Sequence, residues 1–382
     1  MSGAGNGRGK APPVRQAVIV AGGRGSRLGA IAAATPKPLL DVGGRPFVEH
    51  LLFDLGRIGI EEVLLLVGPH RAAFERALRP ARRAAPRLVL VSEPEPAGTA
   101  GALWYARKRL APRFFLLNGD SILDGNLLRL AAAMAERRAG AGAVAALAVP
   151  DTARYGRLAC AGDRIAAFRE KGEGGPGLIN AGVYLFDRRR LLARIARPPC
   201  SLEREVLPAL AADAALRAVR FDGRFIDIGL PESLAEARGL FPAWHRRRGA
   251  FIELGALARA GGAALRWRKG AAGALRRLND AGCYTIVLAP GAVRGEALRR
   301  RLNAGLQSAG AHLDAVYAAR SRSAFEALLD AARAEWPIAE SGSVLITSMP
   351  HIVPQTPPYL AVFRAAPSGD LGPLVAAALD TP

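Results

Sequence analysis

Short apolar runs alternate with amphipathic stretches along the first 240 residues. Each apolar run has the length of one buried strand, and stretches with apolar residues at helical spacing lie between several of them. Strands are predicted at Gln16–Val20, Glu62–Val67, Leu88–Ser92, Phe114–Asn118, Ala143–Val149, Gly182–Phe186 and Phe225–Asp227. Helices are predicted at Val48–Gly56, His70–Leu78, Gly98–Leu110 and Leu127–Arg138. This alternation predicts an α/β domain with a mostly parallel sheet covered on both faces, whose chemistry collects at the carboxyl ends of the strands.

The pattern changes three times along the chain. Residues 1–14 are polar and rich in Gly and Pro, which predicts a disordered tail before a first domain at 15–240. At 241–249 a proline and a basic run interrupt the pattern and predict a linker. Residues 250–382 resume the α/β pattern around an apolar strand at Tyr284–Leu288, so we expect a second, smaller domain there.

The composition narrows the class of protein. The formal net charge is +20, but aromatic residues are only 6% and no basic run is interleaved with them, so nucleic acid is not the favoured partner. Phosphorylated small molecules would respond to the same positive field. Apolar runs are too short to cross a bilayer. Cys160, Cys200 and Cys283 lie far apart, which favours neither disulfides nor zinc and indicates a reducing, cytoplasmic location.

The segment AVIVAGGRGSRLGAIAAATPKPLL, residues 17–40, carries the first candidate chemistry. A strand that ends in small residues lets backbone N–H groups surround phosphate oxygens. Arg24, Arg27 and Lys37 add the positive charge that a leaving pyrophosphate requires. The spacing matches neither the Walker loop nor the dinucleotide fingerprint. The nucleotide-binding candidates here are Ala21, Gly22, Gly23 and Gly25.

A second cluster, SEPEPAGTAGAL, follows the predicted strand that ends at Ser92. Its prolines keep the chain extended, which places Glu93 to hydrogen-bond a base edge. Gly98 and Thr99 begin a predicted helix whose exposed N–H groups allow a ligand to approach closely. The alternative interpretation is a plain strand–loop–helix connection with a Thr N-cap.

Two aspartates follow apolar strands that are far apart in the sequence. Asp120 ends FFLLNGD, and Asp227 ends GRFID. Carboxylates that meet at one sheet edge are ligands for Mg²⁺, whose coordination is completed by phosphates and water. The alternative for Asp120 is a turn residue, and we expect Asp124 to be the N-cap of the next helix.

Between these aspartates lies a set of polar residues suited to a sugar phosphate: Tyr155, Gly156, Glu170, Lys171 and Asn180. Lys171 offers a point charge to a phosphate, and Glu170 and Asn180 can hydrogen-bond hydroxyl groups. Taken singly, each of these charged residues is also typical of a solvated surface.

In this order, the motifs over Gln16–Leu240 resemble those of the sugar-1-phosphate nucleotidyltransferases. The resemblance implies a Rossmann-like, GT-A-like fold with a mixed sheet. It also implies an enzyme that converts a nucleoside triphosphate and a sugar 1-phosphate into an NDP-sugar for cell-surface glycans, with pyrophosphate as the second product. By the same resemblance, Arg27 and Lys37 bind the triphosphate, Asp120 and Asp227 hold Mg²⁺, and Lys171 binds the sugar phosphate.

The strings GLINAGVYLFDRRRLL and SLEREVLPAL look closest to bacterial D-glycero-D-manno-heptose 1-phosphate guanylyltransferases. This favours GTP and a heptose 1-phosphate, while mannose and glucose 1-phosphate nucleotidyltransferases share much of the pattern. A non-catalytic regulatory or scaffold paralogue is the alternative of another class.

Residues 250–382 resemble the haloacid dehalogenase-like heptose bisphosphate phosphatases, with their chemistry lost. Glu253 and Gly255 stand where that family has its nucleophilic and acid/base aspartates. The resemblance therefore implies a degenerate, inactive phosphatase-like domain kept for packing, homo-oligomerisation or regulation. An unrelated α/β domain is the alternative.

Overall fold

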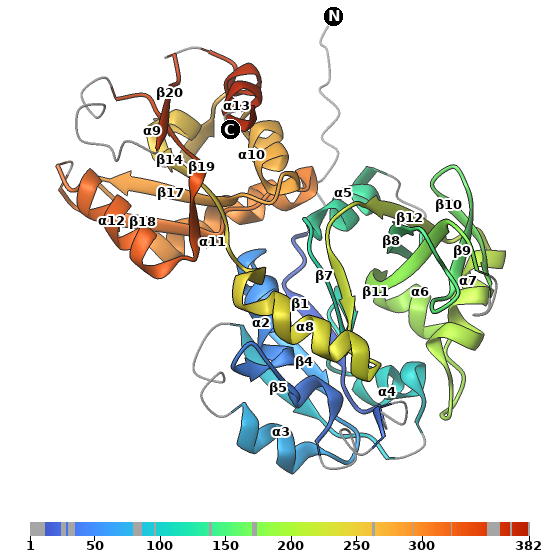
Figure 1. Ribbon diagram of the computed structural model, residues 1–382. Helices are drawn as coiled ribbons and strands as arrows, with labels where there is room; N and C mark the ends of the chain where they lie inside the picture. The colour runs from blue at the N-terminus through green and yellow to red at the C-terminus, as the bar shows by residue number, and fades with distance from the viewer. Residues whose placement is uncertain are drawn as a thin grey trace, which may run out of the picture.

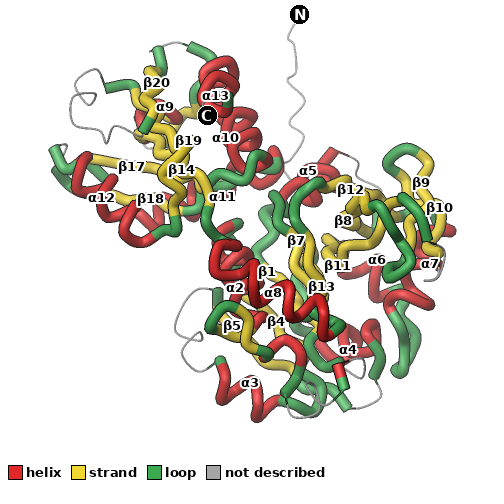
Figure 2. Tube along the Cα trace, in the orientation of Figure 1, coloured by secondary structure: helices red, strands yellow, loops and turns green. Residues whose placement is uncertain are grey.

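The computed structural model of the chain describes residues 12–23, 28–29, 35–78, 86–94, 97–136, 140–169, 174–261, 264–292, 294–321, 323–349, 360–366 and 369–380. These residues form a larger lobe around a nine-stranded sheet and a smaller lobe around a five-stranded sheet (Figures 1 and 2). Helix α8 (Pro231–Trp244) crosses the front of the larger lobe and leads into the smaller one (Figure 1).

The large sheet has the strand order β5-β4-β1-β6-β11-β8-β12-β10-β9. Its strands are β1 (Gln16–Val20), β4 (Glu62–Leu66), β5 (Arg87–Val91), β6 (Arg113–Asn118), β8 (Gly142–Val149), β9 (Arg157–Ala161), β10 (Arg164–Arg169), β11 (Gly177–Asp187) and β12 (Leu216–Phe221). The first four strands in this order are parallel, whereas β11 runs antiparallel to both β6 and β8. The sheet is therefore mixed, as the family resemblance implies, and the expectation of a mostly parallel sheet holds for one half only.

Both faces of this sheet are buried under helices. Along β1, Ala17 and Ile19 belong to one hydrophobic cluster and Val18 to the other, as the alternation of a strand requires. The first cluster includes α2 (Phe47–Arg57), α3 (Arg71–Ala77), α5 (Leu128–Glu136) and α8. The second includes α4 (Thr99–Ala106), α6 (Arg188–Leu192), the π-helical turn η4 (Leu202–Val206) and α7 (Leu207–Ala212).

The expected linker at 241–249 has a different structure. Helix α8 continues to Trp244 and strand β14 begins at Arg247, so only two residues separate them. The reason is the apolar pair Phe241 and Trp244, whose buried rings stack with centroids 4.7 Å apart and hold the end of the helix against the large lobe. The arginines at 246–248 led to the prediction of a linker, because the sequence does not show that the neighbouring aromatic rings are buried.

The smaller lobe is built on an all-parallel sheet with the order β18-β17-β14-β19-β20. Its strands are β14 (Arg247–Glu253), β17 (Tyr284–Pro290), β18 (Ala315–Ala319), β19 (Ile338–Thr347) and β20 (Ala361–Arg364), with a hairpin of β15 (Ala258–Gly261) and β16 (Ala264–Trp267). Its helices are α9 (Leu254–Leu257), α10 (Ala271–Asp280), α11 (Gly295–Leu306), α12 (Phe325–Glu335) and α13 (Leu371–Leu379). This is a second α/β unit; its resemblance to haloacid dehalogenases stays a prediction.

At the carboxyl end of β14, the buried carboxylate of Glu253 is held by its own surroundings. It accepts hydrogen bonds from the Gly255 amide at 2.6 Å, the Ser348 amide at 3.0 Å and the Ser348 hydroxyl at 2.6 Å. These bonds tie the end of β14 to the end of β19. Glu253 therefore has a structural role here; the loss of phosphatase chemistry stays a prediction.

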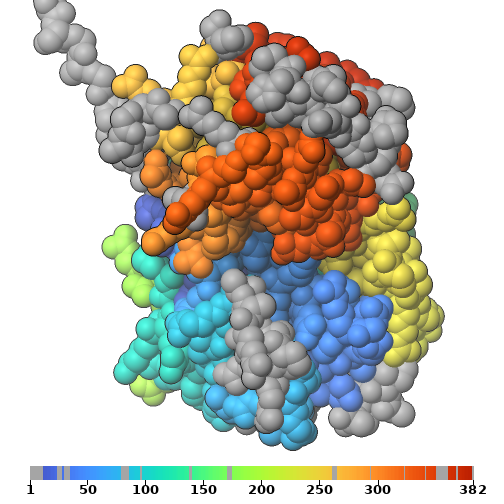
Figure 3. Space-filling model, turned by 90° about the vertical axis from the view of Figure 1, so that its left-hand side faces the viewer, coloured from blue at the N-terminus to red at the C-terminus, as the bar shows by residue number. Residues whose placement is uncertain are grey.

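The two lobes are fastened by polar contacts as well as by α8. Figure 3 shows the orange part of the smaller lobe resting on the blue and cyan N-terminal half. Asn126 donates to Asp280 and to the Gly310 carbonyl, both at 2.7 Å, and Gln307 bonds both the N–H and the carbonyl of Val14. Within the part of the chain that the structure describes, no helix is long and apolar enough to cross a membrane. The three cysteines are free thiols.

Candidate active site

The glycine-rich turn begins directly after β1, at the carboxyl edge of the large sheet. The Ala21 amide donates to the Leu66 carbonyl at 2.8 Å, which fixes the start of the turn against β4. A Cβ on Gly22 would lie 2.8 Å from Glu93 Oε1 and 2.9 Å from the Gly68 nitrogen, so only glycine fits there. A Cβ on Gly23 would meet no atom within 4 Å. Arg24, Gly25 and Arg27 lie outside the described residues.

Glu93 lies beside this turn. Its buried carboxylate accepts a hydrogen bond from the Gly68 amide at 3.0 Å through Oε1. With Gly22, Gly98 and Thr99 it lines a cavity of about 210 Å³. The carboxylate is thus placed at the wall of a pocket, and one of its oxygens also supports the backbone around the glycine-rich turn.

The amino end of α4 differs from the expectation of exposed N–H groups. The Ala100 and Gly101 amides both donate to the Cys200 carbonyl at 3.0 Å, so these amides are not available to a ligand. Thr99 Oγ1 donates to Glu203 at 2.7 Å and accepts from the Leu202 amide at 2.8 Å. The amino end of the helix is therefore bonded to residues 200–203, a distant contact that sequence spacing does not reveal. Gly98 and Thr99 remain lining residues of the pocket.

Lys37 and Asp120 meet at the middle of the carboxyl edge. The Nζ of Lys37 lies 3.4 Å from Asp120 Oδ2, with the lysine side chain only 14% exposed. Lys37 opens a short 3₁₀ turn, η2 (Lys37–Leu39), in which Pro36 and Pro38 restrict the backbone. Together with Ala21, Gly23 and Thr99, these two residues line a second cavity of about 220 Å³.

Asp120 and Asp227 are brought together by a short antiparallel ribbon of β7 (Ser121–Leu123) and β13 (Phe225–Asp227), in which Asp227 pairs with Ser121. The Ile228 amide donates to the Asp120 carbonyl at 2.9 Å, which closes this end of the ribbon. Burial and then the negative charge of Asp120 raise the pKa of the Asp227 carboxyl. Asp120 and Asp227 therefore line the same cavity, as the sequence predicts.

This pair fits a divalent cation. Repulsion between two carboxylates is relieved when a cation binds between them, and hard carboxylate oxygens are the ligands that Mg²⁺ prefers. Within the described ranges, no group of three or more His, Cys, Asp or Glu residues forms a larger metal cluster. Two protein carboxylates are the number typical of magnesium sites that are completed by substrate phosphates.

The expected role of Asp124 as a helix N-cap is wrong. Asn126 Oδ1 accepts from the Leu128 amide at 3.2 Å and so caps the start of α5. The carboxylate of Asp124 instead accepts from Arg224 at 2.8 Å and pairs with Arg247 at 2.6 Å. Both arginines lie at least a hundred positions further along the chain, so no local pattern indicates these contacts.

The largest cavity of the site, about 440 Å³, continues from Asp120 and Asp227 toward β10 and β11. Tyr155, Gly156 and Asn180 line it, as the sequence predicts. The Asn180 amide donates to the Gly156 carbonyl at 3.4 Å, which joins the two segments directly. Glu170 and Lys171 lie outside the described residues.

The cavity is also lined by residues that were not among the predicted site residues, including Asn118, Gly182, Tyr184, Glu203 and Arg204. Gly182 has φ +70°, and a Cβ there would lie 2.5 Å from Asn118 Nδ2, so glycine lets β11 bulge at the pocket. Tyr184 accepts from Asn180 Nδ2 at 2.6 Å, and burial followed by the charge of Glu203 raises its pKa. Asn118 could have been identified from the sequence because it ends an apolar strand. Glu203 and Arg204 could have been identified as charged residues within the string SLEREVLPAL.

The three cavities share walls and form one groove along the carboxyl edge. Asp120 and Glu203 line the cavities of 440 and 220 Å³, and Gly23 and Thr99 line those of 220 and 210 Å³. The groove thus runs from Glu93, past Lys37 and the aspartate pair, to the polar pocket around Asn180. Such a groove accommodates two substrates end to end, with cationic and carboxylate groups where they meet.

Comparisons with known proteins agree with this fold. A family model described as Nucleotidyl transferase matches residues 16–241. The mannose-1-phosphate guanylyltransferase catalytic subunit beta of Dictyostelium discoideum is 32% identical over 232 residues, which is 59% of this chain and 64% of that protein. The subunit of the same name from Drosophila pseudoobscura pseudoobscura is 34% identical over 233 residues, 59% of this chain and 62% of that protein. The chain thus spans less than two thirds of the length of these relatives.

A solved structure gives the same result. HddC from Yersinia pseudotuberculosis has a TM-score of 0.55 at 27% identity, over 60% of this chain and 100% of HddC. Its complex with GMP-PN has a TM-score of 0.54 at the same identity and coverage. These similarities confirm the expected nucleotidyltransferase fold of the larger lobe, and the family match ends before β14.

Proposed function

The chain belongs to the nucleotidyl transferase family, and from this we propose that it transfers the GMP group of GTP to a sugar 1-phosphate, giving a GDP-sugar and pyrophosphate. The observation that carries the proposal is the continuous groove in which Lys37 and Asp120 lie between the glycine-rich turn and the polar pocket. This is the arrangement that two phosphorylated substrates require if they are to react end to end.

The reaction needs positioning and charge neutralisation rather than a protein nucleophile. An oxygen of the sugar phosphate attacks the α-phosphorus of GTP and forms the new P–O bond. The bond from the α-phosphorus to the bridging oxygen breaks, and pyrophosphate leaves with that electron pair. Lys37 lies at the junction of the two halves of the groove, where its charge stabilises the additional negative charge on the phosphoryl oxygens. The turn at Gly22 and Gly23 binds and orients the nucleotide.

Asp120 and Asp227 would hold Mg²⁺, which neutralises charge on phosphate oxygens when bound. Asn180 and Tyr155 bind and orient the sugar ring by hydrogen bonding and contact, and Arg27, Glu170 and Lys171 are proposed for the phosphates and the ring on the strength of the family resemblance. A GTP-utilising enzyme of this kind fits the cytoplasmic location expected from the free cysteines.

For the base, guanine is supported by the names of the relatives and by the GMP-PN complex of HddC. For the sugar, mannose 1-phosphate is the first candidate because the relatives at 32% and 34% identity are mannose-1-phosphate guanylyltransferases. Heptose 1-phosphate is the second candidate, favoured by the resemblance of the strings around Asn180 and Glu203 to heptose 1-phosphate guanylyltransferases.

The test is a matrix of substrates with the full-length protein and Mg²⁺. GTP, ATP, UTP, CTP and dTTP are each combined with mannose, glucose and heptose 1-phosphates, and pyrophosphate release is measured. We expect turnover with GTP and with one of the mannose-configured sugars. Turnover with another nucleotide alone would contradict the choice of base. Silence across the matrix would contradict the proposed activity and favour a regulatory or scaffold role.

A further inference from the structure

The β7–β13 ribbon has the two site aspartates at one end and a cluster of opposite charges at the other. It consists of three residue pairs, from Asp227–Ser121 to Phe225–Leu123, and spans about 10 Å. Beyond the last pair, the Asp124 amide donates to the Arg224 carbonyl at 2.8 Å. The side chain of Arg224 returns to Asp124 Oδ2 through Nη2 at 2.8 Å and Nε at 3.1 Å.

The same carboxylate receives a second arginine from the smaller lobe. Arg247 Nη2 lies 2.6 Å from Asp124 Oδ1, and the side chains are 8% and 12% exposed. Arg247 is the first residue of β14, where its backbone pairs with Ile338 of β19 and its amide donates to the Pro337 carbonyl at 3.2 Å. Asp124 is thus held between the ribbon and the central strand of the second sheet.

The ribbon needs such an anchor. A two-stranded ribbon of this length is marginally stable by itself. Its functional end carries Asp227 at the end of β13 and Asp120 directly before β7, two groups of like charge on opposite strands. Buried charge pairs with several hydrogen bonds fix geometry, since removing one partner leaves an uncompensated charge.

We propose that Arg247 is a positioning residue: through Asp124 it holds the β7–β13 ribbon and thereby the spacing of Asp120 and Asp227. The smaller lobe is in this way a structural part of the candidate site, although its own sheet lies apart from the nine-stranded sheet (Figure 1). The consequence for metal binding rests on the proposed function; the consequence for the ribbon does not.

The direct test is hydrogen–deuterium exchange of the full-length protein without metal. In Arg247→Met, the amides of Asp124 and Ile228, both bonded across the ribbon, are expected to exchange at least tenfold faster than in the wild type. The amides of β1 and β6 serve as internal reference and are expected to change much less. Arg247→Lys, which keeps the charge, is expected to restore most of the protection and provides the second variant if Arg247→Met does not fold.

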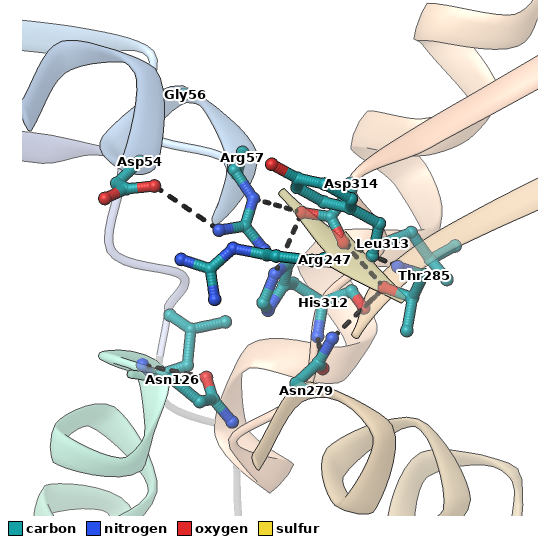
Figure 4. Close-up of polar contacts among 12 residues, drawn as sticks. Asp54, Gly56, Arg57, Asn126, Arg247, Asn279, Thr285, His312, Leu313 and Asp314 are labelled. Carbon is teal, nitrogen blue, oxygen red and sulfur yellow. Dashed lines mark hydrogen bonds and ion pairs between the residues drawn. The ribbon is translucent and has the colours of Figure 1, made fainter. Parts of the chain in front are cut away.

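Arg57→Met is the matched control. Arg57 forms another buried ion pair between the lobes, with Asp314, and lies beside Arg247 without joining the ribbon (Figure 4). Its loss is expected to weaken the interface but to leave ribbon exchange unchanged relative to β1 and β6. Equal acceleration in both variants, or none in Arg247→Met, would overturn the proposal.

Binding of Mn²⁺, used as a probe for Mg²⁺ and followed by electron paramagnetic resonance with a non-hydrolysable GTP analogue, gives a second readout. We expect a three- to tenfold weaker Kd in Arg247→Met and no change in Arg57→Met. A loosened ribbon in a protein that shows no turnover with any substrate pair would support the positioning role and contradict the proposed function. If the wild type shows turnover, but Arg247→Met has unchanged ribbon exchange and unchanged Mn²⁺ affinity, the proposed function is supported and the positioning role of Arg247 is contradicted.

Discussion

Arg57 donates from Nε to the carboxylate of Asp314 at 2.7 Å across the boundary between the lobes, and the two side chains are 10% and 0% exposed. Figure 4 shows the guanidinium between Asp54 and Asp314. Asp314 also accepts from the Thr285 amide at 2.7 Å and hydroxyl at 3.0 Å. Arg57→Met leaves this carboxylate buried without its main counter-charge. We expect the free energy of unfolding to fall by about 3–5 kcal/mol, measured by urea denaturation.

The control for this prediction is an exposed pair in the same lobe. Arg71 and Glu75 lie 2.9 Å apart, but their side chains are 49% and 42% exposed. Arg71→Met is therefore expected to change the free energy of unfolding by no more than about 0.5 kcal/mol. Similar losses in the two variants would show that burial does not determine the strength of the Arg57–Asp314 pair.

The same pair predicts a pH dependence. Burial alone would raise the pKa of the Asp314 carboxyl, but the charge of Arg57 and the hydrogen bonds around it hold that pKa well below its usual range. The stability from the pair is therefore fully present above the pKa of an unfolded Asp, about 4. It is lost as the pH falls through the lower pKa of the folded state. We expect wild-type stability to fall more steeply below pH 4 than that of Asp314→Asn, followed by thermal unfolding at each pH.

Lys37 gives a prediction for activity. Its Nζ lies 3.4 Å from Asp120, and both residues line the 220 Å³ cavity between the cavities of 440 and 210 Å³. Lys37→Met is expected to lower kcat/KM by a factor of about 10²–10³, the order seen when a group that stabilises developing charge is removed. Lys108→Met, on an exposed side chain outside the three cavities, is the control and is expected to keep full activity. Undiminished turnover in Lys37→Met would remove the lysine from the mechanism.

Much of the site could be predicted because its residues follow buried strands in the sequence. Apolar runs of strand length mark β1 and β6, and the residues that follow them, Gly22 and Asp120, necessarily lie at one edge of the sheet. The strand β12 was missed because two arginines interrupt LRAVRF, in which only Leu216, Ala218 and Phe221 are buried. A strand with one exposed face gives a weaker apolar signal than one buried on both faces.

Contacts between distant segments could not be predicted in this way. The amino end of α4 looked free from its sequence, yet the Cys200 carbonyl accepts its first amides from a hundred residues away. Arg247 lay in a basic run that suggested a linker, and only the fold shows that its guanidinium reaches Asp124. The local sequence pattern indicates the type and order of the helices and strands. Ion pairs between distant residues depend instead on how those elements pack against one another.

Two neighbouring glycines of the turn differ in what surrounds them. A Cβ on Gly22 would meet Glu93 Oε1 at 2.8 Å and the Gly68 nitrogen at 2.9 Å, whereas a Cβ on Gly23 meets nothing within 4 Å. Gly22→Ala is expected to displace the turn or the Glu93 carboxylate, lowering the free energy of unfolding by about 1–3 kcal/mol. Gly23→Ala is expected to leave stability unchanged within about 0.5 kcal/mol. Denaturant titrations of both variants decide this, and equal stabilities would contradict the close approach at Gly22.

The ionised carboxylate of Asp227 is expected to lower the stability of the folded protein in the absence of metal. Burial and the nearby Asp120 charge raise its pKa, so its ionised form is disfavoured in the folded protein. That penalty is fully present above the raised pKa and disappears as the pH falls below the usual pKa of an Asp. Asp227→Asn keeps an oxygen that can accept the Gly229 amide, now 2.6 Å from Oδ1, and removes the charge. At pH 7 without metal we therefore expect the variant to be more stable than the wild type, and at pH 3 the difference to vanish.

Added Mg²⁺ is expected to reverse this order. A cation that binds only the folded state stabilises it by RT ln(1 + [Mg²⁺]/Kd), so the wild type should gain stability with Mg²⁺ and Asp227→Asn should gain much less. Thermal unfolding with 0 and 10 mM MgCl₂, roughly a tenfold excess over a millimolar Kd, measures whether the order of stability of the two proteins reverses. The same variant should lose at least a hundredfold in turnover because one of the two carboxylate ligands is gone. A wild type that Mg²⁺ does not stabilise more than the variant would show that the aspartate pair is not a cation site, whatever the activity of either protein.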